Sequence, residues 1–282
     1  MKPLHFQRGF TLVELIIVMV IMGIIGGMVA IFIKSPMDAY FASARRSAMT
    51  DVADTTLRRM SRELRTALPN SVRPYGNQCI EFIATKTGGR YRENDIVSGD
   101  GTGMAFAASL APAVSFNMFG DNSSLPLSQQ IARGDVIVVY NTGQTGADAY
   151  QQDNTATVAG VTLPSPTASS PETTITITQK RFPLESPTKR FQVIPGAGQS
   201  IVAYVCHDGN LHRSVRALDP LGALPAASCP YDGPILVSQV IACNFNYDVG
   251  RNTNAFVSLQ FRLNSNGETV TLQNEVNMGI TP

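Results

Sequence analysis

The stretch that decides the fold is FTLVELIIVMVIMGIIGGMVAIFI, residues 10–33, in which Thr11 and Glu14 are the only polar side chains. At about 1.5 Å per residue, a helix of this length measures about 36 Å and crosses a hydrocarbon core of about 30 Å. The stretch therefore predicts a membrane-spanning helix. The carboxyl group of Glu14 costs free energy inside such a helix, which indicates that it is retained for a partner group.

The residues ahead of the apolar stretch are basic. Lys2, His5 and Arg8 precede it, and residues 1–9 contain no acid. This asymmetry predicts a cytoplasmic N-terminus, with the rest of the chain on the other side of the membrane. A cleaved secretory signal would show small residues and a break in structure after its apolar core. Here a helical pattern continues, which favours a helix that is kept.

That pattern covers residues 34–68, where apolar side chains recur every three or four positions and charged side chains mostly occupy the other face. Pro36 is the only proline between Phe10 and Leu68, and Pro69 follows as a helix terminator. The sequence predicts one long helix, apolar all round at first and amphipathic afterwards. Its amphipathic half requires a globular partner.

From Cys79 onward the pattern changes to the alternation typical of strands. The predicted strands are 79–84, 135–140, 173–178, 191–194, 200–206, 235–249, 255–263 and 269–276. Turns are expected at 248–252 and at 264–267, where an Asn-Gly pair favours a hairpin. Residues 153–174, rich in proline and small residues, are predicted to be a linker-like insertion.

The fold class that follows is α+β. A long N-terminal helix packs its amphipathic half on an antiparallel β-sheet, within a single β-rich globular domain at 69–282. Without residues 1–9 the chain has 20 basic and 21 acidic residues, so no polybasic surface for nucleic acid is expected. The six arginines of 45–65 have acids interleaved with them and predict a solvated or subunit-facing surface.

Four cysteines lie beyond the membrane segment, namely Cys79, Cys206, Cys229 and Cys243. In an oxidising compartment such as the bacterial periplasm, an even count is consistent with two disulfides. Three pairings are possible, and the sequence does not choose among them.

No catalytic constellation stands out. The glycine-rich loop 98–103 lacks a Walker lysine, and the Ser-x-x-Lys pattern of 186–189 lacks its companion motifs. Cys206-His207 with His212 is most simply a disulfide cysteine and two surface histidines. The sequence therefore predicts a non-enzyme without a cofactor.

A calcium site is the remaining metal hypothesis. Asp95, Asp100 and Asp121 lie in predicted loops, but their spacing does not form an EF-hand. No metal site is expected.

The segment Gly9-Phe10-Thr11-Leu12-Val13-Glu14 resembles the processing site of type IV prepilins and pseudopilins. The resemblance implies that residues 1–9 are a leader peptide, removed after Gly9 by a prepilin peptidase, and that Phe10 becomes the N-methylated new N-terminus. It also implies that Glu14 pairs with the N-terminal ammonium of a neighbouring subunit and sets the axial register of a filament. Opposite charges attract strongly in an apolar medium, and either one alone there is penalised.

One departure from the family concerns the helix. Major pilins commonly carry a proline near the position of Ile31, and this chain has none from Phe10 to Ser35. Gly23, Gly26 and Gly27 are the residues that would supply flexibility instead. The departure argues against a major subunit.

Later segments resemble the large minor pilins, and within them those of the mannose-sensitive haemagglutinin (MSHA) pilus. These segments are 62–73, 79–83, 88–92, 182–191, 202–213 and 242–250. The resemblance implies a low-abundance, single-pass inner-membrane subunit with a periplasmic domain. It would join other minor and major pilins, prime filament assembly and be a candidate for the tip. The alternatives are a minor pseudopilin of type II secretion, a tip adhesin and, last, an anchored periplasmic enzyme.

Overall fold

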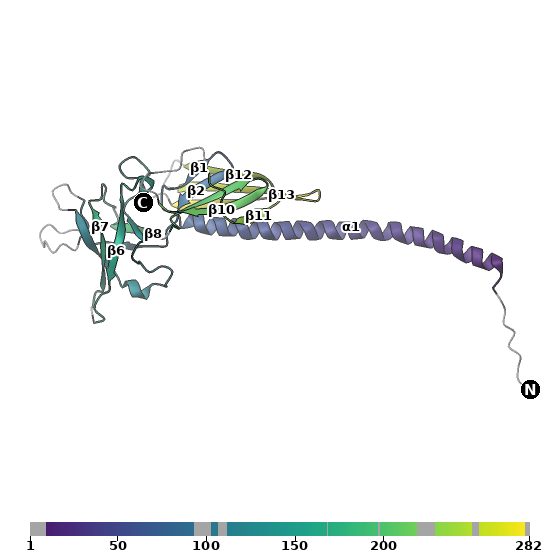
Figure 1. The fold of residues 1–282 in the computed structure, drawn as a ribbon, viewed down its shortest axis with the longest axis horizontal. Helices are drawn as coiled ribbons and strands as arrows, with labels where there is room; N and C mark the ends of the chain where they lie inside the picture. Colours follow the sequence, from purple (N-terminus) through teal and green to yellow (C-terminus); the bar gives the residue numbers. More distant parts are fainter. Residues whose placement is uncertain are drawn as a thin grey trace, which may run out of the picture. The chain divides into compact units, whose positions relative to one another are not determined.

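The computed structural model describes residues 10–92, 103–106, 112–167, 169–196, 198–218, 229–249 and 254–279. Its helix α1 runs without interruption from Leu12 to Arg65 (Figure 1). Pro36 lies inside this helix. The helix ends before the predicted limit at Leu68, because the N–H of Ala67 bonds to the carbonyl three residues earlier and Leu68 joins strand β2 through Ile83 O at 2.8 Å.

The chain divides between Thr50 and Asp51 into two compact units, so the globular unit already includes the end of the helix. The helix residues Ala53, Leu57, Met60 and Leu64 are buried there, at most 3% exposed. Their spacing of three or four residues places them on one face. This buried face explains why the structural boundary lies inside the helix rather than at 68/69.

The described residues form fourteen strands, and all strand pairs are antiparallel. Their bounds are β1 Arg73–Tyr75, β2 Cys79–Ile83, β3 Thr87–Arg90, β4 Ala113–Phe119, β5 Val136–Val138, β6 Thr155–Thr162, β7 Glu172–Lys180, β8 Arg190–Ile194, β9 Ile201–His207, β10 Asn210–Arg216, β11 Ile235–Ser238, β12 Val240–Val249, β13 Asn254–Ser265 and β14 Glu268–Gly279. Two short 3-10 helices, η1 Asn122–Ser124 and η2 Ala149–Gln151, lie in connections.

The strands form three sheets. Their orders are β1-β2-β9-β10-β11, β12-β13-β14 and β3-β8-β5-β6-β7-β4. Aromatic and aliphatic side chains such as Phe116, Phe182 and Phe191 fill the core of the six-stranded sheet. A second cluster, which includes Leu68 and Ile201, joins this sheet to the five-stranded one. The antiparallel β-rich architecture predicted from the sequence is therefore confirmed.

Residues 153–174 were predicted to be a linker-like insertion, and the structure corrects this prediction. Thr155–Thr162 forms strand β6, which pairs with β5 on one side and β7 on the other. Threonine and valine in this segment favour strands. The prolines that suggested a linker lie in the connection between β6 and β7, and they dominated the composition of the whole range.

Residues 235–249 form two strands rather than the single predicted one. Gln239, with a φ of 63°, separates β11 from β12 and passes the chain from the five-stranded to the three-stranded sheet. Five strands were missed altogether. They are short, contain glycine as in Thr87–Arg90, or carry a register shift as β10 does.

The predicted Asn-Gly hairpin is confirmed. Asn266 and Gly267 have φ angles of 49° and 84°, as a type I′ turn requires, and they connect β13 to β14. The predicted turn at 248–252 falls mostly on residues outside the described part of the chain.

Glu63 ties the helix to the five-stranded sheet. Its Oε2 accepts a hydrogen bond from Tyr204 Oη at 2.8 Å and lies 3.0 Å from Arg213 Nε, while its Oε1 lies 3.2 Å from Arg59 Nε. Tyr204 is fully buried on β9, and Arg213 lies opposite it on β10. One carboxylate thus links α1 to two strands that are more than 140 residues away in sequence.

Asn274 provides a second connection to the helix. Its Nδ2 donates to Ser61 Oγ at 2.8 Å, which attaches β14 to the same turn of α1. Both the five-stranded and the three-stranded sheets therefore contact the amphipathic part of the helix.

Two disulfides close the globular unit. Cys79 pairs with Cys229 across a sequence separation of 150 residues, and Cys206 pairs with Cys243 across 37 residues. The first packs beside Val205 of β9, and the second connects the five-stranded sheet to β12. This is one of the three pairings that the sequence left open.

We expect both disulfides to stabilise the fold, the longer loop more than the shorter. Chain-entropy arguments give upper contributions of about 5 and about 4 kcal/mol for these separations. Urea unfolding of the Cys79→Ala/Cys229→Ala and Cys206→Ala/Cys243→Ala double variants, without reductant, measures each loss. An unfolding midpoint unchanged by dithiothreitol in the unsubstituted protein would contradict the expectation.

We also expect stability to fall in alkali. Burial and the Glu63 carboxylate raise the pKa of Tyr204 above its ordinary value of 10. Because the folded-state pKa is the higher one, this contribution is complete below about pH 10 and is lost as the pH rises through the folded-state pKa. Tyr204→Phe should cost about 1.5–3 kcal/mol near neutral pH and flatten the alkaline decline. Thermal unfolding between pH 7 and 11 tests this. The control is Tyr231→Phe at an exposed position, which should change neither the stability near neutral pH nor its decline in alkali.

Candidate functional site

The first turn of helix α1 carries the predicted assembly residue Glu14, and the predicted processing residue Phe10 lies just before the helix. Thr11 is its N-cap, because the N–H of Glu14 donates to Thr11 Oγ1 at 3.3 Å and the N–H of Leu15 donates to Thr11 O at 3.2 Å. Glu14 therefore stands at the third helical position, as in a capping box. A carboxylate here also interacts favourably with the positive end of the helix dipole. Phe10 is 81% exposed, and Gly9 lies outside the described residues.

The helix surface that follows is apolar and uncovered. Every residue from Leu12 to Ile33 is exposed, including Ile31 and Phe32 at more than 75%. Among the described residues, α1 is the one helix long and apolar enough to cross a membrane, and its apolar window has no buried side chain. A surface of this kind must be covered by lipid or by neighbouring helices.

The three glycines of this segment make no close approach within the chain. A Cβ built on Gly23, Gly26 or Gly27 would meet nothing within 4 Å. Packing inside this chain therefore does not require glycine at these positions. Their remaining effects are to loosen the helix and to leave flat surface for an adjacent helix.

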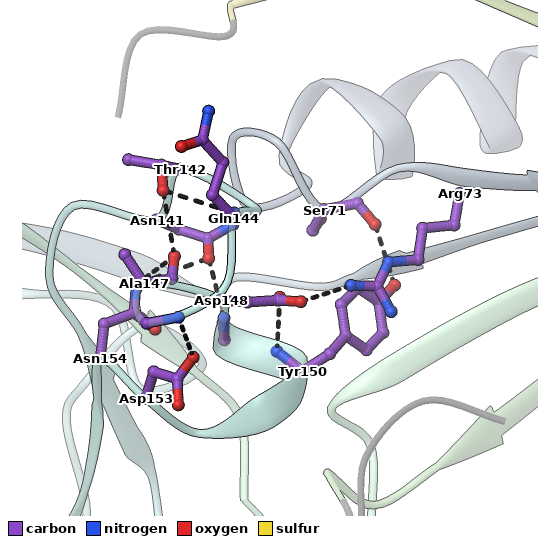
Figure 2. A network of polar contacts seen from close by, with 12 residues as sticks. Ser71, Arg73, Asn141, Thr142, Gln144, Ala147, Asp148, Tyr150, Asp153 and Asn154 are labelled. Carbon is purple, nitrogen blue, oxygen red and sulfur yellow. Dashed lines mark hydrogen bonds and ion pairs between the residues drawn. The ribbon is translucent and has the colours of Figure 1, made fainter.

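Arg73 and Asp148 belong to a network of polar contacts in the globular unit, shown in Figure 2. Arg73 Nη2 lies 2.6 Å from Asp148 Oδ2, and the Arg73 guanidinium sits 3.7 Å from the centre of the Tyr150 ring. Tyr150 Oη donates to Ser71 O at 2.9 Å, and burial raises the pKa of this tyrosine well above its ordinary value. The side chain of Asn141 bonds to Pro69 O and to the N–H of Ala149.

This network is structural rather than catalytic. It holds the loop around η2 against the chain segment that leaves helix α1, and its acid and base are already bonded to each other. The sequence did not predict it, because Arg73 and Asp148 are 75 residues apart and neither belongs to a motif.

The charged side of the helix borders an open groove next to β14. The groove has a volume of about 770 Å³, and Arg58, Arg62 and Arg65 line it from the helix. Arg58 Nε lies 2.7 Å from Asp54 Oδ2 in an exposed ion pair, which contributes little to stability. These arginines form a surface open to solvent or to a neighbouring subunit, as their interleaved acids predicted.

The other chemical candidates have structural partners. Cys206 is in a disulfide, the His207 ring stacks on Tyr231 with centres 4.0 Å apart, and His212 Nδ1 lies 3.0 Å from Gly233 O. Ser186 Oγ accepts a hydrogen bond from the N–H of Arg190.

The lysine of the Ser-x-x-Lys pattern, Lys189, is paired with Glu185. Asp121 caps η1, whereas Asp95, Asp100 and residues 98–102 lie outside the described residues. In the part of the chain that the structure describes, no group of His, Cys, Asp and Glu is arranged to hold a metal.

Comparison with known proteins gives one match. Residues 4–30 match the family described as the prokaryotic N-terminal methylation motif. No curated protein and no solved structure matches the chain.

The match covers the capped first turn, Glu14 and most of the exposed apolar surface. This motif implies processing by prepilin peptidase and N-methylation, and the hydrophobic helix is consistent with a prepilin anchored in the inner membrane. A long apolar N-terminal helix packed on antiparallel sheets is the pilin-like α+β fold. Proteins of this kind are structural and not enzymes. In its N-terminal segment, the chain is therefore similar to type IV pilin-like and pseudopilin-like proteins.

Proposed function

We propose that the chain is a minor subunit of an MSHA-type pilus, similar to MshO, that primes or caps filament assembly. The observation that carries the proposal is the uncovered apolar helix with a single carboxylate in its first turn. Such a helix is stable in the membrane as a monomer and in a bundle of like helices as a filament. Passing from the membrane into the filament requires a polar contact that selects the axial register between subunits. Glu14 is the group available for this contact.

In this proposal, cleavage after Gly9 creates the charge that Glu14 needs. The new ammonium on Phe10 stands at the positive end of the helix dipole, where a cation is disfavoured. The Glu14 carboxylate of an adjacent subunit offsets that cost. In return, the ammonium neutralises this carboxylate, which would otherwise be unpaired in an apolar environment. The pairing acts between subunits and therefore fixes their axial offset.

Two features support a minor rather than a major role. The helix contains no proline in its membrane half, where major pilins of the resembled family carry one near Ile31. The periplasmic part also has three sheets and two disulfides, which give it distinct surfaces for neighbouring pilins. Its resemblance to MSHA minor pilins supports minor-pilin neighbours and a position at the pilus tip. A minor pseudopilin of type II secretion would share the same first turn.

We expect Glu14→Gln to separate processing from assembly. The variant keeps the N-cap and the helix, so mass spectrometry should find a methylated Phe10 start as in the unsubstituted protein. Its amount in sheared pili should fall at least about tenfold, because the neighbouring ammonium loses its partner. Asp51→Asn, an exposed acid on the same helix, is the matched control and should assemble normally.

Three results bear on the wider proposal. Gly9→Asp should block cleavage, so that the protein still starts at Met1 and is absent from fibres. Normal incorporation of Glu14→Gln would refute the pairing. Loss of hydrolase secretion with normal pili, in a strain lacking the protein, would replace the pilus with the secretion system.

A further inference from the structure

Two arginines stand opposite each other on neighbouring strands of the six-stranded sheet. Arg90 of β3 and Arg190 of β8 are directly opposite in the antiparallel register. Both side chains are exposed, and they project from the same face of the sheet. Like charges directly opposite on neighbouring strands destabilise a sheet.

No acid compensates this pair among the described residues. Six other arginines lie within ion-pair distance of a carboxylate: Arg58, Arg59, Arg73, Arg92, Arg213 and Arg216. Neither Arg90 nor Arg190 has such a contact in that part of the chain. The adjacent Lys189 is paired with Glu185, the acid nearest to Arg190 in the sequence. Among the described residues, these two guanidinium groups therefore lie opposite each other without a carboxylate at ion-pair distance.

A hollow of about 450 Å³ adjoins the two arginines. Its floor is Gly88, which faces the same way as Arg90 and stands opposite Gln192. A Cβ on Gly88 would meet Phe191 O at 2.9 Å, so the close approach of the two strands here requires glycine. Thr85 also lines the hollow.

We propose that this hollow binds an oxyanion, either a phosphate or a carboxylate group of a ligand. Guanidinium groups bind both through paired N–H donors, and two of them side by side fit a group with several oxygens. A bound anion would also remove the repulsion between Arg90 and Arg190. The site lies in the globular unit and does not depend on prepilin processing or on the pilus proposed above.

The test uses the full-length protein in detergent micelles at pH 7. Thermal unfolding is followed in sodium phosphate, in sodium glucuronate as the carboxylate probe, and in sodium chloride at matched ionic strength. An anion that binds the folded state stabilises it by RT ln(1 + L/Kd), where L is the free anion concentration, so the unfolding temperature rises with the anion concentration. We expect phosphate, glucuronate or both to raise it beyond the chloride reference. Phosphate alone would assign a phosphorylated ligand, and glucuronate would assign a carboxylated one.

The variants Arg190→Gln and Arg90→Gln locate the effect. Each substitution should lower the apparent affinity for the anion at least tenfold. Without anion, each variant should be as stable as the unsubstituted protein or more stable, because the repulsion between the arginines is relieved. Arg262→Gln, an exposed arginine on β13, is the matched control and should keep the full response. The proposal is overturned if neither anion acts beyond chloride, or if the Arg190→Gln and Arg90→Gln variants respond as the unsubstituted protein does.

Discussion

The apolar surface of helix α1 between Leu12 and Ile33 is the constraint on which the rest of the protein depends. This chain buries none of it, so the segment is stable only in lipid or against other helices. Both environments penalise an unpaired charge, which gives Glu14 its importance in the first turn. The Thr11 side chain accepts the backbone N–H of Glu14, and the Glu14 carboxylate has no partner among the described residues. In the proposed function, this single segment combines anchoring with a contact that specifies neighbours.

The other end of the helix is buried on one face by the chain itself. From Asp51 onward one face is buried by the globular unit, and polar contacts from Glu63 and Ser61 fix the helix to two different sheets. A buried apolar stripe holds a helix with little directional preference, whereas a carboxylate shared by Tyr204 and Arg213 allows few orientations. The disulfides and the Arg73–Asp148 network add further restraints around this junction. These contacts all lie within the globular unit, where they hold the last turns of the helix against the sheets.

Prediction from the sequence succeeded where the signal is local. The helix, the Asn266-Gly267 hairpin and most of the long strands follow from periodicity and turn chemistry over ten or twenty residues. It failed at β6, where the prolines of the following connection dominated the composition, and at Gln239, where one residue with positive φ divides a continuous apolar run between two sheets. Short or glycine-containing strands such as Thr87–Arg90 were missed, because only their neighbours in the sheet stabilise them.

The sequence by itself determined the apolar helix, its orientation signals, the processing motif and the position of Glu14, because each depends on residues close together in the chain. Only the tertiary structure decided which cysteines pair, which acid attaches the helix to the sheets, and that Arg90 and Arg190 stand opposite each other. These relations join residues from 37 to 150 positions apart. They arise from sheet register and chain crossing, and no spacing rule along the sequence encodes them.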